Sequence, residues 1–163
     1  NNSRHIAKRI AKIRQQQPLS RTEDLVAAVI GKEVQTFLHD TSAELDIPAA
    51  AKKDLAKAFQ ALRIEVNDEM GALREMLLAA KDLLKPGGRI AILTYHSLED
   101  RIVKQAYKEL SKGCTCPRDF PVCVCGNKPI IKEVTKKPIL PSKEELESNP
   151  RSRSAKLRVC EKL

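Results

Sequence analysis

Aromatic side chains are scarce in this chain of 163 residues: they make up 3% of the sequence, and tryptophan is absent. Hydrophobic residues still account for 42%, which is enough to supply a core. No apolar run approaches the roughly 20 residues that a membrane-spanning helix needs, and no signal peptide opens the sequence. These absences argue against a membrane protein. The length suits one domain, or one small domain plus part of another.

Acidic residues are absent from positions 1–21, which hold six lysines and arginines. Residues 22–100 carry nine basic and fourteen acidic side chains, whereas residues 101–163 carry fifteen basic and seven acidic ones. The formal net charge of +9 is therefore concentrated at the two ends of the sequence. A basic surface suits a polyanion such as RNA, but a surplus of lysine and arginine is more often only a solvated surface.

Cysteine occurs five times, an odd number, in a sequence without secretory features, which favours reduced thiols in the cytoplasm. Four of the five form two Cys-x-Cys pairs separated by six residues: Cys114, Cys116, Cys123 and Cys125. Four thiolates could hold a tetrahedral zinc ion, although paired Cys-x-x-Cys motifs would be the stronger sign. From spacing alone we favour free thiols in a surface loop over zinc. Cys160 is expected to be a small buried residue in a strand.

Residues 3–16 are expected to form the first helix, with aliphatic side chains on one face and basic ones on the rest. It is either an amphipathic surface helix or an RNA-facing one, and spacing does not separate these alternatives. The segment from Ser20 to Glu23 matches a capping box that would open a short helix ending at Gly31. The weakly patterned residues 32–47 could form a further short helix. Its apolar residues would be Val34, Phe37 and Leu38.

Apolar residues recur every three or four positions from Pro48 to Leu84, which predicts a long one-sided helix with a bend or break at Gly71. Within it, Arg63 and Asn67 lie one turn apart and share a face, so both could point at one ligand. Spacing alone favours an ordinary solvated face for these two residues.

The segment LKPGGRIAILTYHSLEDR, residues 84–101, is the centre of the sequence pattern. Its unbroken apolar run from Ile90 to Leu93 is typical of a parallel strand covered on both faces, so a central strand is expected over residues 89–95. Ser97 would cap the next helix, with Asp100 three residues on. His96 and Ser97 would then lie at the carboxyl end of the strand, the edge where open α/β sheets bind ligands.

The end of the sequence predicts a helix over residues 98–111 and two strands, residues 130–134 and 155–160, that would close the sheet antiparallel at its edge. Between the strands, residues 149–158 hold four basic side chains and two serines around a turn-forming Asn-Pro. Such a segment can donate many hydrogen bonds to phosphates. The alternative is a charged edge strand whose lysines and arginines keep it soluble.

Three stretches together resemble one family of enzymes. They are FQALRIEVNDEM (residues 59–70), GGRIAILTYHSLEDRIVK (residues 87–104) and NPRSRSAKLRV (residues 149–159). They resemble the bacterial 16S ribosomal RNA (cytosine-N4)-methyltransferases, which modify N4 of a cytosine in the small-subunit ribosomal RNA. Tyr95 stands where many members carry phenylalanine, which keeps an aromatic at that position.

The resemblance implies an α/β fold: a partial class I methyltransferase (Rossmann-like) sheet with an inserted helical substrate-recognition domain. Residues 1–60 would belong to the inserted domain and residues 61–163 to the carboxyl-terminal part of the sheet domain. The cofactor implied is S-adenosylmethionine. The family's glycine-rich cofactor loop, its ribose-binding acidic residue and its Asp-Leu-Gly turn have no equivalent in these 163 residues. We therefore expect the carboxyl-terminal half of an enzyme, inactive by itself, with most of the cofactor site elsewhere.

The implied partner is small-subunit ribosomal RNA, with neither DNA nor a membrane. Arg63 and Asn67 would position the substrate, and His96 and Ser97 would shape the pocket. His96 could act as a general base, but a role in holding the turn is favoured because amine methylation needs little base assistance. RNA phosphates would be bound by Arg151, Arg153, Lys156 and Arg158.

Two other interpretations come from different classes of protein. One is a non-catalytic module that binds ribosomal RNA or a protein, and the other is a structural protein stabilised by zinc on the four cysteines. Cofactor binding by the whole protein would separate the enzyme from the binding module, and metal analysis would decide the third interpretation.

Overall fold

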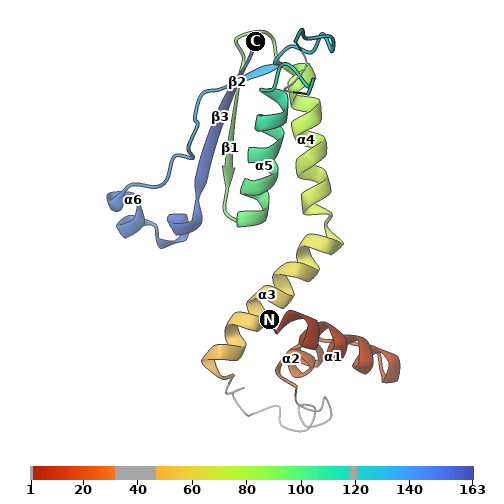
Figure 1. Ribbon diagram of the computed structural model, residues 1–163. Coiled ribbons are helices and arrows are strands. Elements are labelled where there is room, and N and C mark those ends of the chain that lie inside the picture. Colours follow the sequence, from red (N-terminus) through yellow and green to blue (C-terminus); the bar gives the residue numbers. More distant parts are fainter. Residues whose placement is uncertain (1, 32–46, 118–120) are drawn as a thin grey trace. The chain divides into compact units, whose positions relative to one another are not determined.

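Figure 1 shows the computed structural model, which describes residues 2–31, 47–117 and 121–163. The chain divides into two compact units, Asn1–Asn67 and Asp68–Leu163. Residue 60, the predicted limit of the inserted domain, lies inside a helix of the first unit. In the part of the chain that the structure describes, no helix has both the length and the apolar character needed to cross a membrane.

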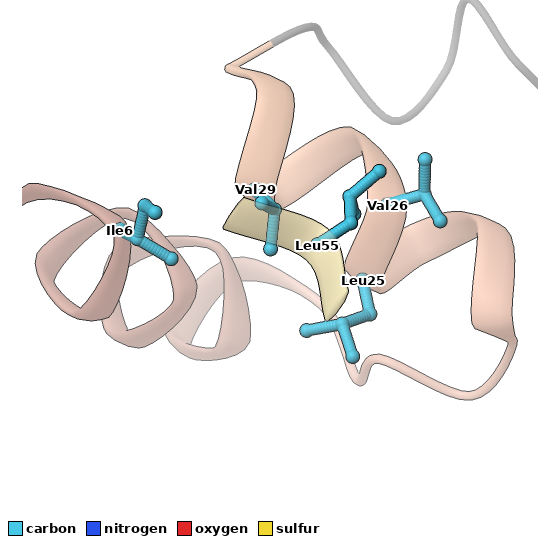
Figure 2. Packing of buried hydrophobic residues seen from close by; sticks show 5 residues of the cluster. All are labelled: Ile6, Leu25, Val26, Val29 and Leu55. Atoms are coloured by element: carbon cyan, nitrogen blue, oxygen red, sulfur yellow. The ribbon is translucent and has the colours of Figure 1, made fainter. Parts of the chain in front are cut away.

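The first unit is helical and has its own aliphatic core. Its helices are α1 (Ser3–Gln16), α2 (Thr22–Ile30) and α3 (Ala49–Val66). Figure 2 shows side chains from all three helices meeting in this core: Ile6, Leu25, Val26, Val29 and Leu55. The helices predicted over residues 3–16 and after Ser20 are confirmed, and the scarcity of aromatic residues is matched by a core built from Ile, Leu and Val.

Helix α2 begins one residue later than the predicted capping box requires. The carboxylate of Asp24, not that of Glu23, accepts hydrogen bonds from the backbone N–H groups of Ser20 and Arg21, both at 2.9 Å. Asp24 is buried, so these two bonds also satisfy a charge that would otherwise be costly inside the unit. Gly31 ends the helix in the left-handed conformation (φ 81°), as predicted. The helix expected around Val34, Phe37 and Leu38 lies outside the described residues.

The long helix predicted up to Leu84 is broken, but at Asn67 and Asp68 rather than at Gly71. Asp68 adopts a positive φ of 47°, and its carboxylate accepts a hydrogen bond from the backbone N–H of Gly71 at 3.2 Å, which opens helix α4 (Glu69–Leu83). A Cβ atom at position 71 would collide with that carboxylate. Gly71 is therefore a residue that makes room for the cap and does not itself break the helix.

The second unit combines two long helices with a small antiparallel sheet. Its strands are β1 (Arg89–Thr94), β2 (Ile131–Glu133) and β3 (Lys156–Lys162), in the order β1-β3-β2. Helix α5 (Ser97–Leu110) contacts all three strands, and α4 packs beside α5 (Figure 1). The core of this unit consists of Leu77, Val103, Tyr107, Ile131 and Cys160. The Tyr107 hydroxyl donates to the carbonyl of Ile90 at 3.3 Å, which ties α5 to β1.

The strand predicted over residues 89–95 is confirmed as β1, but the prediction that it is central and parallel is wrong for this chain. Among the described residues, β1 lies at the edge of the sheet and pairs only with β3, antiparallel. Both helices cover the face that carries Ile90 and Ile92, whereas Leu93 on the other face is 51% exposed. The apolar run is thus buried on one face only. The two carboxyl-terminal strands are antiparallel, as predicted.

Candidate functional site

One end of the sheet gathers most of the predicted site residues of the second unit. The last residue of β1, Thr94, pairs with the first residue of β3, Lys156, and the Thr94 hydroxyl donates to the Lys156 carbonyl at 3.3 Å. This pairing brings the turn that follows β1 to the same end of the sheet as the 3-10 helix η2 (Pro150–Ser154), which precedes β3. We call residues 94–97 and 151–156 the strand-end site.

The turn from β1 into α5 is held by the carboxylate of Glu99, whereas the sequence pattern predicted Asp100 as the carboxylate of the cap. His96, not Ser97, is the residue that precedes the helix, so the predicted capping position is one residue too late. The carboxylate of Glu99 accepts hydrogen bonds from the backbone N–H groups of Tyr95 (3.0 Å) and His96 (3.1 Å). These hydrogen bonds fix the backbone of the turn from which the side chains of His96 and Ser97 extend.

Asp100, predicted as a capping residue, instead forms an ion pair with β3. Its carboxylate oxygens accept hydrogen bonds from Arg158 Nε at 2.7 Å and Nη2 at 3.4 Å, and Lys156 Nζ lies 3.4 Å from Oδ2. The side chains of Arg158 and Asp100 are only 7% and 13% exposed. Hydrogen bonding from Arg158 is the main cause that lowers the pKa of Asp100 below 3.8, against the opposing effect of burial.

This pair changes the expectation for Arg158. In β3, Arg158 is paired with Ile92, so its side chain lies on the face covered by α5, where Asp100 is its partner. A buried guanidinium that is committed to an internal carboxylate is not positioned to contact an RNA phosphate. We therefore assign Arg158 to holding β3 against α5. Lys156, whose side chain is 37% exposed, takes part in the same group.

Arg151 and Arg153 have the opposite environment. Both lie in η2, where the buried Ser152 between them donates its hydroxyl hydrogen to the carbonyl of Asn149 at 2.8 Å. Ser152 anchors the short helix, and the two arginines on either side of it are exposed. Neither guanidinium is paired with another residue in the described ranges. These two side chains are the members of the predicted basic set with the exposure that phosphate contact needs.

The structure also brings to this end two residues that were not among the predicted site residues. Tyr95 is 47% exposed and Leu98 is 46% exposed, so an aromatic ring and an aliphatic side chain stand next to His96 and Ser97. Exposed aromatic rings combined with basic side chains are common in proteins that bind unstacked bases. The sequence signal that could have identified Tyr95 as a site residue is its position directly after an apolar strand. No local sequence pattern indicates that Asp100 pairs with Arg158.

Arg63 and Asn67 lie in the first unit, at the end of α3. Both are exposed, and the backbone N–H of Asn67 donates to the carbonyl of Arg63 at 3.0 Å, so the helix ends at the pair. The predicted proximity of these two residues along one helix is thus present.

The four clustered cysteines converge in the connection between α5 and β2. Their sulfur atoms all lie within 4.8 Å of one another. The backbone N–H groups of Thr115 and Asn127 lower the pKa of Cys125 to about 5, which favours a thiolate there. Cys160, in contrast, is a buried residue of the core, as predicted. Burial is the main cause that raises its pKa.

Both a family model and curated relatives that match this chain align with nearly all of its residues, and they are named as methylases or methyltransferases. Residues 1–163 match the MraW methylase family. The chain is 50% identical over 165 aligned residues to the ribosomal RNA small subunit methyltransferase H of Brevibacillus brevis, and 49% identical to that of Heliobacterium modesticaldum. Each alignment covers 99% of this chain and 48% of the relative, so the chain spans about half the length of these curated relatives. Because the match extends over all of its residues, the chain belongs to the MraW methylase family.

Proposed function

We propose that this chain is part of an enzyme that transfers a methyl group from S-adenosylmethionine to N4 of a cytosine in small-subunit ribosomal RNA. The observation that carries the proposal is the family match over residues 1–163, together with relatives named ribosomal RNA small subunit methyltransferase H. The resemblance of three separate motifs to (cytosine-N4)-methyltransferases supplies the choice of base and atom. We place this activity in the cytoplasm, with ribosomal RNA as the partner.

The residues of this chain do not fit most of a cofactor site. A class I site holds its cofactor at a glycine-rich turn between a strand and a helix, but the turn from β1 to α5 reads Thr94-Tyr-His-Ser97 and has no glycine. We therefore propose that other parts of the whole protein bind S-adenosylmethionine. In that arrangement the uncovered edge and face of β1 form one wall of the site. The first unit would be part of an inserted substrate-recognition domain.

The role that we propose for the strand-end site is to receive the RNA. Methylation at N4 requires the cytosine to leave its stack so that its amine can be placed in line with the methyl donor. Arg151 and Arg153 would bind phosphates next to the extruded nucleotide, and the exposed ring of Tyr95 offers a stacking surface. His96 and Ser97 would shape the pocket on the turn that Glu99 fixes.

Arg63 and Asn67 would position the substrate from the inserted domain. The two residues lie one helix turn apart in sequence, which suits two contacts to the same nucleotide. This role predicts that Arg63→Ala or Asn67→Ala raises the KM for RNA although the variant protein still folds. Thermal unfolding of the same variants supplies the control for folding.

The experiment that tests the proposed function identifies the product. The whole protein is incubated with isotopically labelled S-adenosylmethionine and small-subunit ribosomal RNA, and the RNA is digested to nucleosides for mass spectrometry. We expect label in N4-methylcytidine, with less label from a His96→Ala, Ser97→Ala variant. Label in 5-methylcytidine or in a purine would refute the choice of base and atom. RNA binding without cofactor binding by the whole protein would favour the non-catalytic binding module.

A further inference from the structure

The four clustered cysteines have the geometry of a metal site. Zinc–sulfur bonds of about 2.3 Å at tetrahedral angles place neighbouring sulfur atoms about 3.8 Å apart. Here the sulfur atoms of Cys114 and Cys125 are 3.8 Å apart, and those of Cys123 and Cys125 are 3.5 Å apart. The four sulfur atoms, which include that of Cys116, all lie within 4.8 Å of one another. Two Cys-x-Cys pairs that are separated in sequence therefore meet around one point.

Backbone groups next to the cysteines are arranged as they are around bound thiolates. The N–H of Thr115 donates to Cys125 Sγ and the N–H of Cys116 donates to Cys114 Sγ, both at 3.3 Å. Asn127 Nδ2 donates to the Thr115 hydroxyl at 2.8 Å, which connects the two halves of the loop a second time. Hydrogen bonds of this kind orient ligands and reduce the repulsion among several negatively charged sulfur atoms.

The connection that carries the cysteines has little else to hold it. Residues 111–130 join α5 to β2, and in the part of this segment that the structure describes there is neither a helix nor a strand. Such connections are uncommon in compact domains above roughly 15 residues. Val122 and Val124 are 70% and 73% exposed, so burial of apolar side chains contributes little. Its two ends nevertheless meet, since the Ile130 N–H donates to the Leu110 carbonyl at 2.9 Å.

Other uses of four neighbouring thiols fit less well. A disulfide needs two sulfur atoms about 2.05 Å apart and gives no reason for the second Cys-x-Cys pair to converge on the first. An iron–sulfur cluster places several iron and sulfide ions between its cysteines, which requires more room than this group leaves. A single tetrahedral ion with four sulfur ligands uses every cysteine of the group.

We propose that Cys114, Cys116, Cys123 and Cys125 bind one zinc ion as four thiolates and thereby fix the connection between α5 and β2. This inference goes beyond the methyltransferase activity and does not depend on it. It also reverses the preference based on spacing alone, because spacing could not show that the four sulfur atoms converge. On binding, the thiols that are still protonated release their protons to solvent, and no electron is transferred.

The test is elemental analysis of the purified chain, prepared under reducing conditions without added metal. We expect about one zinc per chain, and less than about one tenth of that in Cys114→Ser and Cys125→Ser variants. The matched control is Cys160→Ala, which also removes one cysteine but leaves the four ligands in place and should keep its zinc. Cobalt(II) added to the zinc-free chain should give the visible absorption of a tetrahedral thiolate complex.

A Cys125→His variant protects the test against misfolding of the serine variants. Histidine can ligate zinc but cannot form a disulfide, so this variant should retain more zinc than Cys125→Ser. Removal of zinc with a chelator should also lower the midpoint temperature of thermal unfolding of the native sequence. The same treatment should leave the midpoint temperature of the Cys114→Ser variant unchanged. The proposal is overturned if the reduced chain contains no zinc and all four thiols react freely, if its metal is iron, or if mass spectrometry finds these cysteines paired in disulfides.

Discussion

At the scale of single residues, the ion pair of Asp100 and Arg158 joins α5 to β3. The two residues are 58 positions apart in sequence, and nothing in either motif predicts that they meet. Sequence patterns found the right kind of residue at helix starts but not the right position, because several carboxylates lie within one turn and only the folded backbone selects among them. Asp24 and Glu99 are the residues selected here, where Glu23 and Asp100 were predicted.

Asp100→Asn should lower the free energy of unfolding by about 3 kcal/mol, because it leaves the buried guanidinium of Arg158 without its counter-charge. Lys156→Gln removes the more exposed partner of the same carboxylate and should cost less than about 1 kcal/mol. Urea unfolding of the two variants measures both values. Equal losses would mean that the buried pair contributes no more than the exposed one.

The same pair predicts how stability depends on pH. The pKa of Asp100 is lowered in the folded state, so its contribution is complete above the ordinary carboxyl pKa of 3.8 and is lost as the pH falls through the lower, folded-state value. The difference in unfolding free energy between the native sequence and Asp100→Asn should therefore shrink below pH 3.8. Denaturant titrations across this range test the sign, and a difference that grows on acidification would contradict it.

At the scale of elements, the helices were largely predictable and the neighbours of the strands were not. Periodicity of three or four located α1, α2, α4 and α5, since each helix buries one face. The apolar run from Ile90 to Leu93 indicates a strand that can be buried on both faces, but it does not predict which strand pairs with it. In this chain that strand is β3, and the pairing is antiparallel.

The break between α3 and α4 gives a prediction at this scale. Asp68→Ala should lower the free energy of unfolding by about 1 to 2 kcal/mol, because it removes the cap of α4 and places alanine at a positive φ. Asp68→Asn should change stability little, since asparagine caps helices well and tolerates this conformation. Circular dichroism during thermal unfolding compares the two, and similar losses for both variants would show that the cap is unimportant.

At the scale of the whole molecule, the chain has two small cores and a sheet that is covered on one face. This arrangement agrees with a chain that spans about half the length of its relatives. The motifs predicted the family, and the family match over residues 1–163 confirms it.

The 163-residue chain alone should neither bind S-adenosylmethionine measurably nor methylate RNA. Its strand-to-helix turn lacks the glycines of a cofactor loop, and β1 can supply only one wall of the site. Calorimetric titration with the cofactor is the measurement, with the whole protein as the positive control. Saturable one-to-one binding at micromolar concentration would mean that residues assigned to substrate and packing roles form the cofactor site.

The central claim is that the strand-end site contacts ribosomal RNA through Arg151 and Arg153. The most direct test is the salt dependence of small-subunit RNA binding by the native sequence and two double variants. Arg151→Ala, Arg153→Ala should weaken binding and flatten the slope of log K against log salt concentration by about one unit for each phosphate that the variant no longer binds. The control Lys104→Ala, Lys108→Ala removes the same charge from exposed positions on α5 and should change the slope much less. Equal effects of the two double variants, or unchanged affinity and slope in the arginine variant, would contradict the account.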